Sequence, residues 1–224
     1  MFIARLSGEL LRSRDVTSRT QLASFASLLA LLAVGCPVAS EAPDAPTDAP
    51  ADAPLDAYAA PITLDDDATA ALDPSQLFAG PMACRPPVLV RVVHVTDGDT
   101  MRVESVDTRV IETVRFTAIN TPEVAHIAGQ VDECYGPEAT TFTYALLNHL
   151  VWLTFDASCV DPYMRTLAYV HVGPSPEGFW QRQLMRRGLA RAYIIGRNRA
   201  LEGNATADQA TAIAESRGMW AACF

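Results

Sequence analysis

The stretch VLVRVVHVTDGDTMRVESVDTRVIETVRFTAINTPE, residues 88–123, decides the fold of this 224-residue chain. Its β-branched run and its alternation of apolar with polar residues predict three strands joined by short turns, the first turn being TDGD at residues 96–99. Strands joined by short turns run antiparallel, so we expect a meander. NTPE at residues 120–123 ends the pattern, because Pro122 has no N–H to donate to a strand ladder.

The segments that follow complete the predicted domain. We expect helices over residues 137–150, 177–190 and 205–220, and strands over residues 151–156 and 165–172. Five strands with a helix between the third and the fourth is the connectivity of an OB-type barrel. The expected fold is therefore α+β, a five-stranded OB-type β-barrel with three helices, over residues 81–224.

The N-terminal segment, residues 1–36, is predicted to be a signal peptide. A basic stretch precedes thirteen apolar or small residues, Leu22–Val34, which as a helix would rise only about 20 Å, less than a bilayer core. The run ends in LLAVGC and resembles a bacterial lipoprotein signal, although Ala33 stands where Leu is usual. We therefore expect lipidation at Cys36 and attachment to a membrane, with an ordinary secreted protein and a buried helix as the alternatives.

Residues 37–80 are predicted to be a disordered linker. The segment repeats Ala, Pro and Asp, as in EAPDAPTDAPADAPLDA at residues 41–57, so it has little apolar surface to bury and its carboxylates repel one another. The net charge of the chain is −9, but residues 37–83 hold nine acids and no base, while residues 84–224 carry thirteen Arg against fifteen acids. The acidity therefore does not exclude a nucleic-acid partner for the folded domain.

The cysteines agree with export. Without Cys36 four remain, an even number that suits disulfides in an oxidising compartment, and the absence of a CxxC pair argues against zinc. Four cysteines allow three pairings, of which we expect Cys134–Cys159 and Cys84–Cys223, the second joining the two ends of the domain.

Six blocks of sequence resemble, in order, the signature segments of the staphylococcal nuclease-like (thermonuclease) family. The blocks are VTDGDTMRV, VRFTAINTPE, CYGPEA, DPYMRTLAYV, LMRRGLARAY and ESRGMW, and they cover about residues 88–220. Each block alone is a weak signal, but six in register with the expected strands and helices carry the resemblance. The family is known as calcium-dependent phosphodiesterases on an OB barrel, so the resemblance implies a nuclease.

The resemblance also implies roles for individual residues. Asp99 matches a calcium-ligating carboxylate, in a turn that Asp97 and Thr100 also line. Thr121 matches a position whose backbone oxygen binds calcium, and Asn120 stands where the family has a second calcium-binding Asp. An amide oxygen can still bind calcium but brings no charge, so we expect weaker metal binding, and Asn120→Asp should lower the calcium concentration needed for half-maximal activity.

The resemblance also implies which residues contact the substrate and which one acts on the attacking water. Arg115 and Arg165 match arginines that bind the scissile phosphate, and Glu123 matches the carboxylate that activates the attacking water. Tyr163 and Tyr193 match aromatic residues that pack on the nucleotide. Hydrolysis of a phosphodiester needs a hard cation, fixed positive charge and a proton acceptor, so the chemistry agrees with these assignments.

We thus expect an exported, monomeric, lipid-anchored nuclease, or alternatively a secreted one, that hydrolyses DNA and/or RNA with Ca²⁺. The alternative function is a binding module, for nucleic acid or protein, that kept the barrel and lost turnover. Asn120, and Met164 in place of the usual Gly beside the second arginine, favour that alternative, while Glu123 and both arginines oppose it. A structural envelope lipoprotein is a third interpretation. His126 is interpreted as a solvated loop residue, and Trp220 as a core residue.

Overall fold

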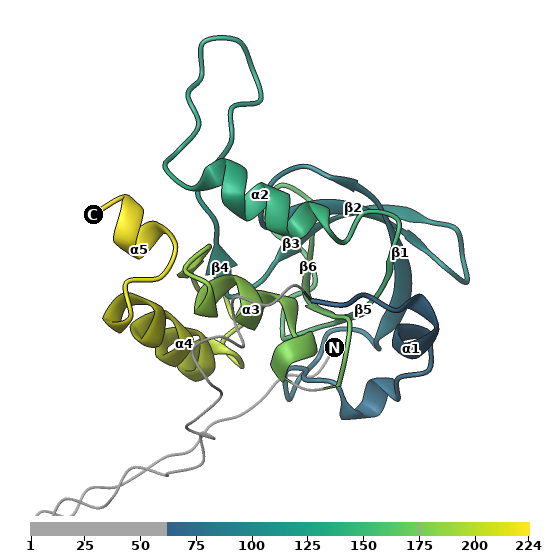
Figure 1. The fold of residues 1–224 in the computed structure, drawn as a ribbon. Helices are drawn as coiled ribbons and strands as arrows, with labels where there is room; N and C mark the ends of the chain where they lie inside the picture. The colour runs from purple at the N-terminus through teal and green to yellow at the C-terminus, as the bar shows by residue number, and fades with distance from the viewer. Residues whose placement is uncertain (1–61, 175) are drawn as a thin grey trace, which may run out of the picture. The chain divides into compact units, whose positions relative to one another are not determined.

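Five strands close into a barrel in the structure, a computed structural model that describes residues 62–174 and 176–224 (Figure 1). Around the barrel they are β1 (Val88–Val95), β2 (Thr100–Ser105), β3 (Ile111–Phe116), β6 (Thr166–His171) and β5 (Leu150–Thr154). Neighbouring strands are antiparallel except β3 and β6, which are parallel. The prediction of an α+β fold built on an OB-type barrel is confirmed.

Alternate residues of these strands fill the interior of the barrel. Val92 pairs with Val103, and Met101 pairs with Val114, and all four side chains are buried. Because side chains alternate between the two faces of a strand, this apolar set points inward while the residues between them face outward. The apolar residues of the alternation read from the sequence are therefore the ones that fill the barrel.

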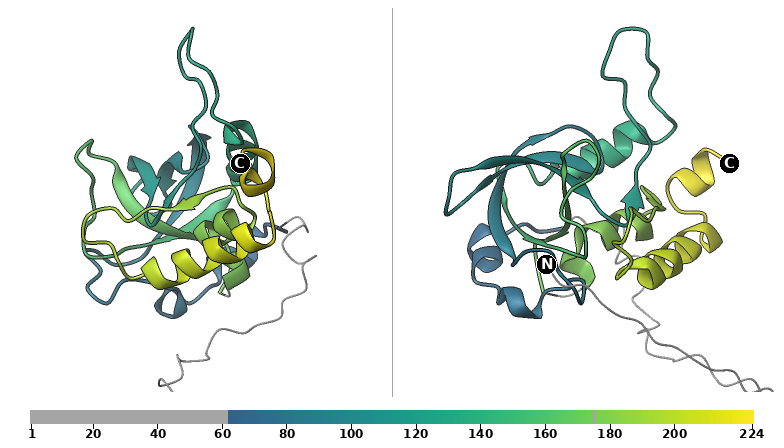
Figure 2. Two further views of the ribbon diagram at one scale, coloured as in Figure 1. Left: turned by 90° about the vertical axis from the view of Figure 1, so that its left-hand side faces the viewer. Right: turned by 180° about the vertical axis from the view of Figure 1, so that it is seen from behind.

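Two short strands outside the barrel position the site. β4 (Ile119–Asn120) continues the chain after β3 and pairs antiparallel with β7 (Arg191–Ala192), which the sequence analysis did not predict. Asn120 lies opposite Arg191 in this pair. The segment between β4 and α2 projects away from the barrel, as all views of the ribbon show (Figures 1 and 2).

The first two predicted helices are present but shorter. α2 (Gly136–Tyr144) ends before residue 150, since the chain continues in tight turns in which Asn148 has a φ of 70°. α3 (Trp180–Arg186) follows a 3-10 turn, η3 (Pro176–Gly178), and packs on β6, and Trp180 and Leu184 are buried in the core.

The third predicted helix, residues 205–220, is two helices. α4 (Glu202–Ala214) packs along α3, and the short α5 (Met219–Ala222) follows a break at Gly218 (Figure 2). Gly218 has a φ of 53°, and a Cβ there would lie only 2.4 Å from the carbonyl oxygen of Gly188. The backbone of the chain thus changes direction where only glycine fits.

The folded domain begins earlier than predicted, because residues 62–80 are not part of a disordered linker. α1 (Asp66–Ala70) is capped by Asp65 and packs on β5, and a 3-10 turn, η2 (Pro74–Gln76), follows it. Leu77 is buried, and Phe78 packs its ring on those of Tyr169 and Phe179. The physical reason is that this segment has several apolar side chains to bury, Ile62, Leu64, Leu77 and Phe78, whereas the repeats before it consist mainly of Ala, Pro and Asp.

The expected disulfide pairing is wrong. The bonds are Cys84–Cys159 and Cys134–Cys223. Cys84 is anchored beside the end of β5, where its N–H donates to the carbonyl of Asp156, so it faces Cys159 in the next loop. Cys134 lies just before α2, and Cys223 follows α5 directly, so this bond joins the projecting segment to the end of α5.

The predicted signal peptide, the lipidation site Cys36 and residues 37–61 lie outside the described residues. Among the residues that the structure describes, no helix combines the length and apolar character needed to cross a bilayer.

Candidate active site

The turn between β1 and β2 presents two aspartates to the bend that follows β4. The Asp97 carboxylate accepts from the N–H of Asp99, and the Asp99 carboxylate accepts from the N–H of Thr121, 2.9 Å away. Gly98 lies between them so close to the bend that a Cβ would be 2.8 Å from the side chain of Thr121. The DGD and NTPE segments, 22 residues apart at Asp99 and Thr121, are therefore in direct contact.

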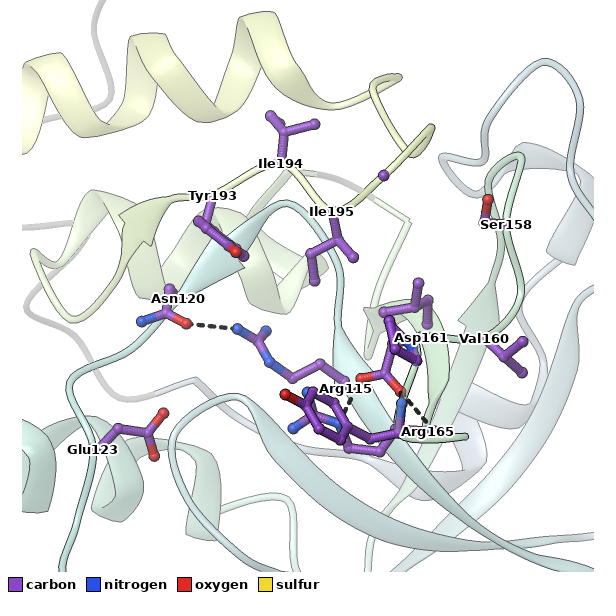
Figure 3. A pocket seen from close by; sticks show the side chains of 14 residues that line it. Arg115, Asn120, Glu123, Ser158, Val160, Asp161, Arg165, Tyr193, Ile194 and Ile195 are labelled. Atoms are coloured by element: carbon purple, nitrogen blue, oxygen red, sulfur yellow. Dashed lines mark hydrogen bonds and ion pairs between the residues drawn. The ribbon is translucent and has the colours of Figure 1, made fainter.

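Arg115 is buried beneath the site and is held by several partners. Its Nε lies 3.0 Å from Oδ1 of Asp99, one terminal nitrogen donates to the carbonyl of Ile119, and the other donates to Oδ1 of Asn120, 2.8 Å away (Figure 3). Charge-assisted bonds of this kind fix both the position and the plane of the guanidinium group. Arg115 is therefore a rigid positive charge, ion-paired to Asp99.

The expected calcium ligands are bonded to groups of the protein. The side-chain oxygen of Asn120 faces Arg115, and its amide nitrogen donates to the carbonyl oxygen of Thr121, 3.2 Å away. Asp99 uses its carboxylate on Arg115, Thr100 and the N–H of Thr121. In this arrangement each of the three predicted ligands has a partner within the protein, and their role as calcium ligands stays a prediction.

A different group of side chains does converge. One carboxylate oxygen each from Asp97 and Glu123 and one ring nitrogen of His126 lie within 4.8 Å of one another, close enough to hold one metal ion. Nε2 of His126 lies 4.0 Å from Oδ2 of Asp97. Sequence reasoning placed Asp97 in the turn and His126 in solvent; the signal for this group was the string DGD together with an acid and a histidine three residues apart.

The carboxylates of the site are poised for a cation. Burial raises the pKa of Asp97, and the nearby charge of Glu123 raises it further. Burial also raises the pKa of Asp99 to about 6, against the opposing effect of Arg115, and Asp97 adds to the rise. The pKa of Glu123 is raised by burial and by the charge of Asp99. A bound divalent cation would offset this accumulation of negative charge.

Glu123 is held by the projecting segment. Its N–H donates to the Glu133 carboxylate, and its carbonyl accepts from the N–H of Glu133. A Cβ at Gly136 would lie 2.3 Å from the same carbonyl, so the start of α2 approaches Glu123 at a distance that only glycine allows.

Arg165 is oriented by Asp161, which sequence reasoning missed. The Asp161 carboxylate accepts from Nε of Arg165 at 2.7 Å and from the backbone N–H groups of Tyr163 and Arg165 at 2.9 Å. The turn so formed holds Met164 at a φ of 63°, which explains why a glycine at this position would be unstrained. Arg165 bonds to Asp161 through its Nε, and it lines the pocket described next.

One pocket of about 490 Å³ is lined by Arg115, Asn120, Glu123, Asp161 and Arg165 (Figure 3). Arg115 lies opposite Leu167 in the β3–β6 pair, two residues from Arg165, which brings both guanidinium groups to the same cavity. Figure 3 shows Glu123 and Asn120 on one side of Arg115 and the Asp161–Arg165 pair on the other. Tyr163 and Tyr193, both largely exposed, also line it.

The structure thus brings together the predicted phosphate-binding, water-activating and nucleotide-packing residues, and it places Asp99 behind Arg115. Asn120 lines the pocket as well, but as a partner of Arg115. The site is thus a pocket lined by both basic and acidic side chains on an OB-type barrel.

Comparison with known proteins names the family. Residues 113–222 match the profile of the family described as Staphylococcal nuclease homologue. The chain is 36% identical over 109 residues to a thermonuclease of Staphylococcus hyicus and 37% identical over 108 residues to a thermonuclease of Staphylococcus intermedius. Each alignment covers 48% of this chain and 61% of the relative, so the chain spans about three fifths of the length of these relatives. Over this region the chain is staphylococcal nuclease-like.

Proposed function

We propose that this protein is a divalent-metal-dependent nuclease that hydrolyses phosphodiester bonds of DNA and/or RNA. The observation that carries the proposal is one pocket lined by Arg115, Arg165 and Glu123, next to the carboxylates of Asp97 and Asp99. Arg165 bonds to Asp161 through its Nε, so its terminal nitrogens can donate to the non-bridging oxygens of a phosphate, while Arg115 adds a fixed positive charge. Both arginines stay charged at any working pH. The two thermonuclease relatives support the same reaction.

Each side chain has a defined task in the proposed reaction. Arg115, fixed by Asp99, and Arg165, fixed by Asp161, hold the phosphate and offset the negative charge that grows as water attacks. The Glu123 carboxylate accepts a proton from the attacking water, and its raised pKa brings it closer to the working pH, as suits a general base. The oxygen that leaves the phosphorus takes up a proton, and two shorter strands result.

The residues present fit a divalent cation. Asp97 and Glu123 supply hard oxygen donors, and Asp99 lies within interaction range of both. Calcium, which prefers oxygen ligands, is the ion expected from the sequence and the first one to test. When bound, the cation would polarise the phosphate and its water ligands.

Degradation of single-stranded DNA by the full-length chain tests the proposal. We expect cleavage with added calcium or another divalent cation and none with chelator. Glu123→Ser and Arg165→Ala should each lower the rate at least about 100-fold, because each removes a group that acts in the transition state. Arg109→Ala is the matched control, since Arg109 is a largely exposed residue paired with Glu104 in another turn.

Two outcomes would contradict it. Cleavage that survives chelation removes the metal from the mechanism. Absence of cleavage with every cation, together with retained binding of DNA, would favour the binding module instead. One observation supports that alternative: Arg115 uses its Nε and both terminal nitrogens within the protein.

We further propose that the domain is exported and held at a membrane through a lipid on Cys36, acting as a monomer. Two disulfides in the folded domain support an oxidising compartment. Cys36→Ser should shift the protein from the membrane fraction to the soluble fraction. An unchanged membrane fraction would overturn the lipid anchor, and complete release of the unaltered protein would favour simple secretion.

A further inference from the structure

We propose that Arg191, Trp220 and Phe224 form a binding subsite, separate from the pocket, for an unpaired nucleotide of a single-stranded nucleic acid. The inference rests on the proposed function, since it extends the path of the same strand beyond the pocket. Sequence reasoning assigned Trp220 to the core, whereas its ring is only partly buried.

The cluster combines two stacked rings with one cation. The rings of Trp220 and Phe224 are stacked, with centroids 5.3 Å apart and planes inclined by 25°. The guanidinium carbon of Arg191 lies 5.8 Å from the Trp220 centroid and 5.3 Å from the Phe224 centroid. These distances are within the range of cation–π attraction.

The cluster is open to a ligand. Phe224 is 75% exposed, so one face of its ring contributes little to the stability of the fold. Arg191 is exposed, and none of the carboxylates among residues 62–174 and 176–224 lies within ion-pair distance of it. A stacking ring beside a cation without an acidic partner is the chemistry that binds a nucleobase and its phosphate.

Strand geometry joins the cluster to the pocket. Arg191 of β7 lies directly opposite Asn120 of β4, and directly opposed residues of an antiparallel pair point to the same face. Tyr193, two residues along, points to that face as well. Asn120 and Tyr193 both line the pocket, so Arg191 stands at its edge, and α5 lies beside β4 in the ribbon (Figure 1).

The disulfide Cys134–Cys223 fixes the cluster relative to the segment that carries Glu123. Cys223 precedes Phe224, and Cys134 lies in the segment that also carries Glu123. The residue next to the exposed ring is thus tied covalently to the segment that carries Glu123. A strand whose scissile phosphate lies at Arg115 and Arg165 would pass Tyr193 and reach the rings with a neighbouring base.

Binding of oligonucleotides of two lengths tests the subsite. Fluorescence anisotropy of labelled oligo-dT, two and six nucleotides long, is measured on the full-length protein in the presence of chelator to prevent cleavage. For Phe224→Ala and Arg191→Met we expect the affinity for the hexanucleotide to fall at least about 5-fold, since stacking of one base contributes that much. The affinity for the dinucleotide should stay within about 2-fold, because it fills the pocket alone.

Matched variants separate binding from folding. Tyr144→Ala removes an exposed aromatic ring from α2, and Arg102→Met removes an exposed arginine from β2; both should bind like the unaltered protein. Phe224→Tyr keeps a ring and should restore hexanucleotide affinity. The variants are compared only where their thermal stabilities are equal, so that a loss of affinity reflects binding and not unfolding.

Two results would overturn the subsite. The first is unchanged hexanucleotide affinity in both Phe224→Ala and Arg191→Met. The second is an equal loss for both lengths, which would place the residues in the pocket itself. If either result is found while the unaltered protein still binds and cleaves nucleic acid, the subsite fails and the proposed function stands. If the unaltered protein binds neither oligonucleotide, the subsite and the proposed function both fail.

Discussion

At the residue scale, Asp161 carries the clearest consequence for catalysis. Its carboxylate is 3% exposed and accepts from Nε of Arg165 and from the backbone on either side of Met164. Arg165 lowers the pKa of Asp161, against the effect of burial, so the carboxylate stays charged at neutral pH. Asp161 is a positioning residue: it acts on the substrate only through the guanidinium that it holds.

Asp161→Asn should lower kcat about 10- to 100-fold, the effect of one charge-assisted hydrogen bond. KM should change much less, since Arg165 remains cationic and still attracts phosphate. Steady-state kinetics on single-stranded DNA measures both values. Glu202→Gln, which removes an exposed ion pair with Arg199, is the control and should change neither. Equal changes of kcat in the two variants would contradict the positioning role.

The ion preference of the proposed metal site should also depend on a single residue. His126 adds a ring nitrogen to the carboxylates of Asp97 and Glu123. Imidazole is a good ligand for zinc and a poor one for calcium, which prefers oxygen. His126→Asn should therefore weaken zinc binding at least about 10-fold and change calcium binding less than about 3-fold. Isothermal titration with each ion measures the two affinities.

The control for the metal experiment is His94→Asn, which removes an exposed histidine from β1. It should leave both affinities unchanged, apart from weak zinc sites on the surface. If His126→Asn and His94→Asn have the same effect on zinc, His126 does not belong to the metal group.

At the scale of elements, the segment before the barrel contributes to stability. Phe78 contacts the rings of Tyr169 and Phe179, and its carbonyl accepts from the hydroxyl of Thr154. Phe78→Ala should lower the free energy of unfolding by about 2 kcal/mol, less than for a fully buried ring because the side chain is half-buried. Chemical denaturation measures it. Met82→Ala, at a side chain 72% exposed in the same segment, should cost less than about 0.5 kcal/mol.

The same segment shows where sequence reasoning reached its limit. The barrel strands were predicted because each carries its own alternation, as in Met101 and Val103, and because the turns bear Gly or Pro. Residues 62–80 carry only a few apolar residues among acids. Their ordered structure depends on contacts with β5 and β6, which cannot be predicted from a local sequence pattern. The two-residue strands β4 and β7 were invisible for the same reason.

The candidate site was likewise predictable from the sequence only in part. Arg115, Glu123 and Arg165 were found because they occur in sequence blocks that resemble a family. Which oxygens face one another was not predictable, because it depends on rotamers: Asn120 faces Arg115, and His126 faces Asp97. Disulfide pairing failed for a similar reason, since it is set by loop paths in three dimensions.

At the scale of the whole molecule, His171 links stability to pH. Its ring is buried between Phe179 and the hydroxyl of Thr154, and burial lowers its pKa to about 4. In the unfolded chain the pKa is near 6.5. Between these values the unfolded state binds more protons, so this residue makes the protein less stable as the pH falls from about 6.5 to about 4.

The loss from His171 should reach about 3 kcal/mol at pH 4 relative to pH 7. His171→Gln cannot gain this proton, so the difference in unfolding free energy between the two proteins should shrink or reverse on acidification. The carboxylates of the site act in the opposite sense, because burial raises the pKa of Asp99, but they are common to both proteins and cancel. Denaturation curves at pH 7, 5.5 and 4 measure the effect, and parallel pH profiles would contradict it.

The two disulfides close loops of similar length but should differ in function. Cys84–Cys159 spans 75 residues and Cys134–Cys223 spans 89, so in the chain-entropy account each should contribute about 4 kcal/mol to stability. Only Cys134–Cys223 holds the segment that carries Glu123 and His126. Replacing that pair by Ser should therefore lower both the unfolding free energy and the metal affinity, whereas replacing Cys84 and Cys159 should lower only the first.

Metal titration of both double variants, well below their unfolding temperatures, separates these effects. We expect the Cys134→Ser, Cys223→Ser protein to need at least about 10-fold more metal for half-maximal activity, because its ligands must be ordered at the moment of binding. The Cys84→Ser, Cys159→Ser protein serves as the control of equal destabilisation. Equal metal requirements in the two variants would mean that the projecting segment is ordered by its own hydrogen bonds, such as that from Ala125 to Asp132, without help from α5.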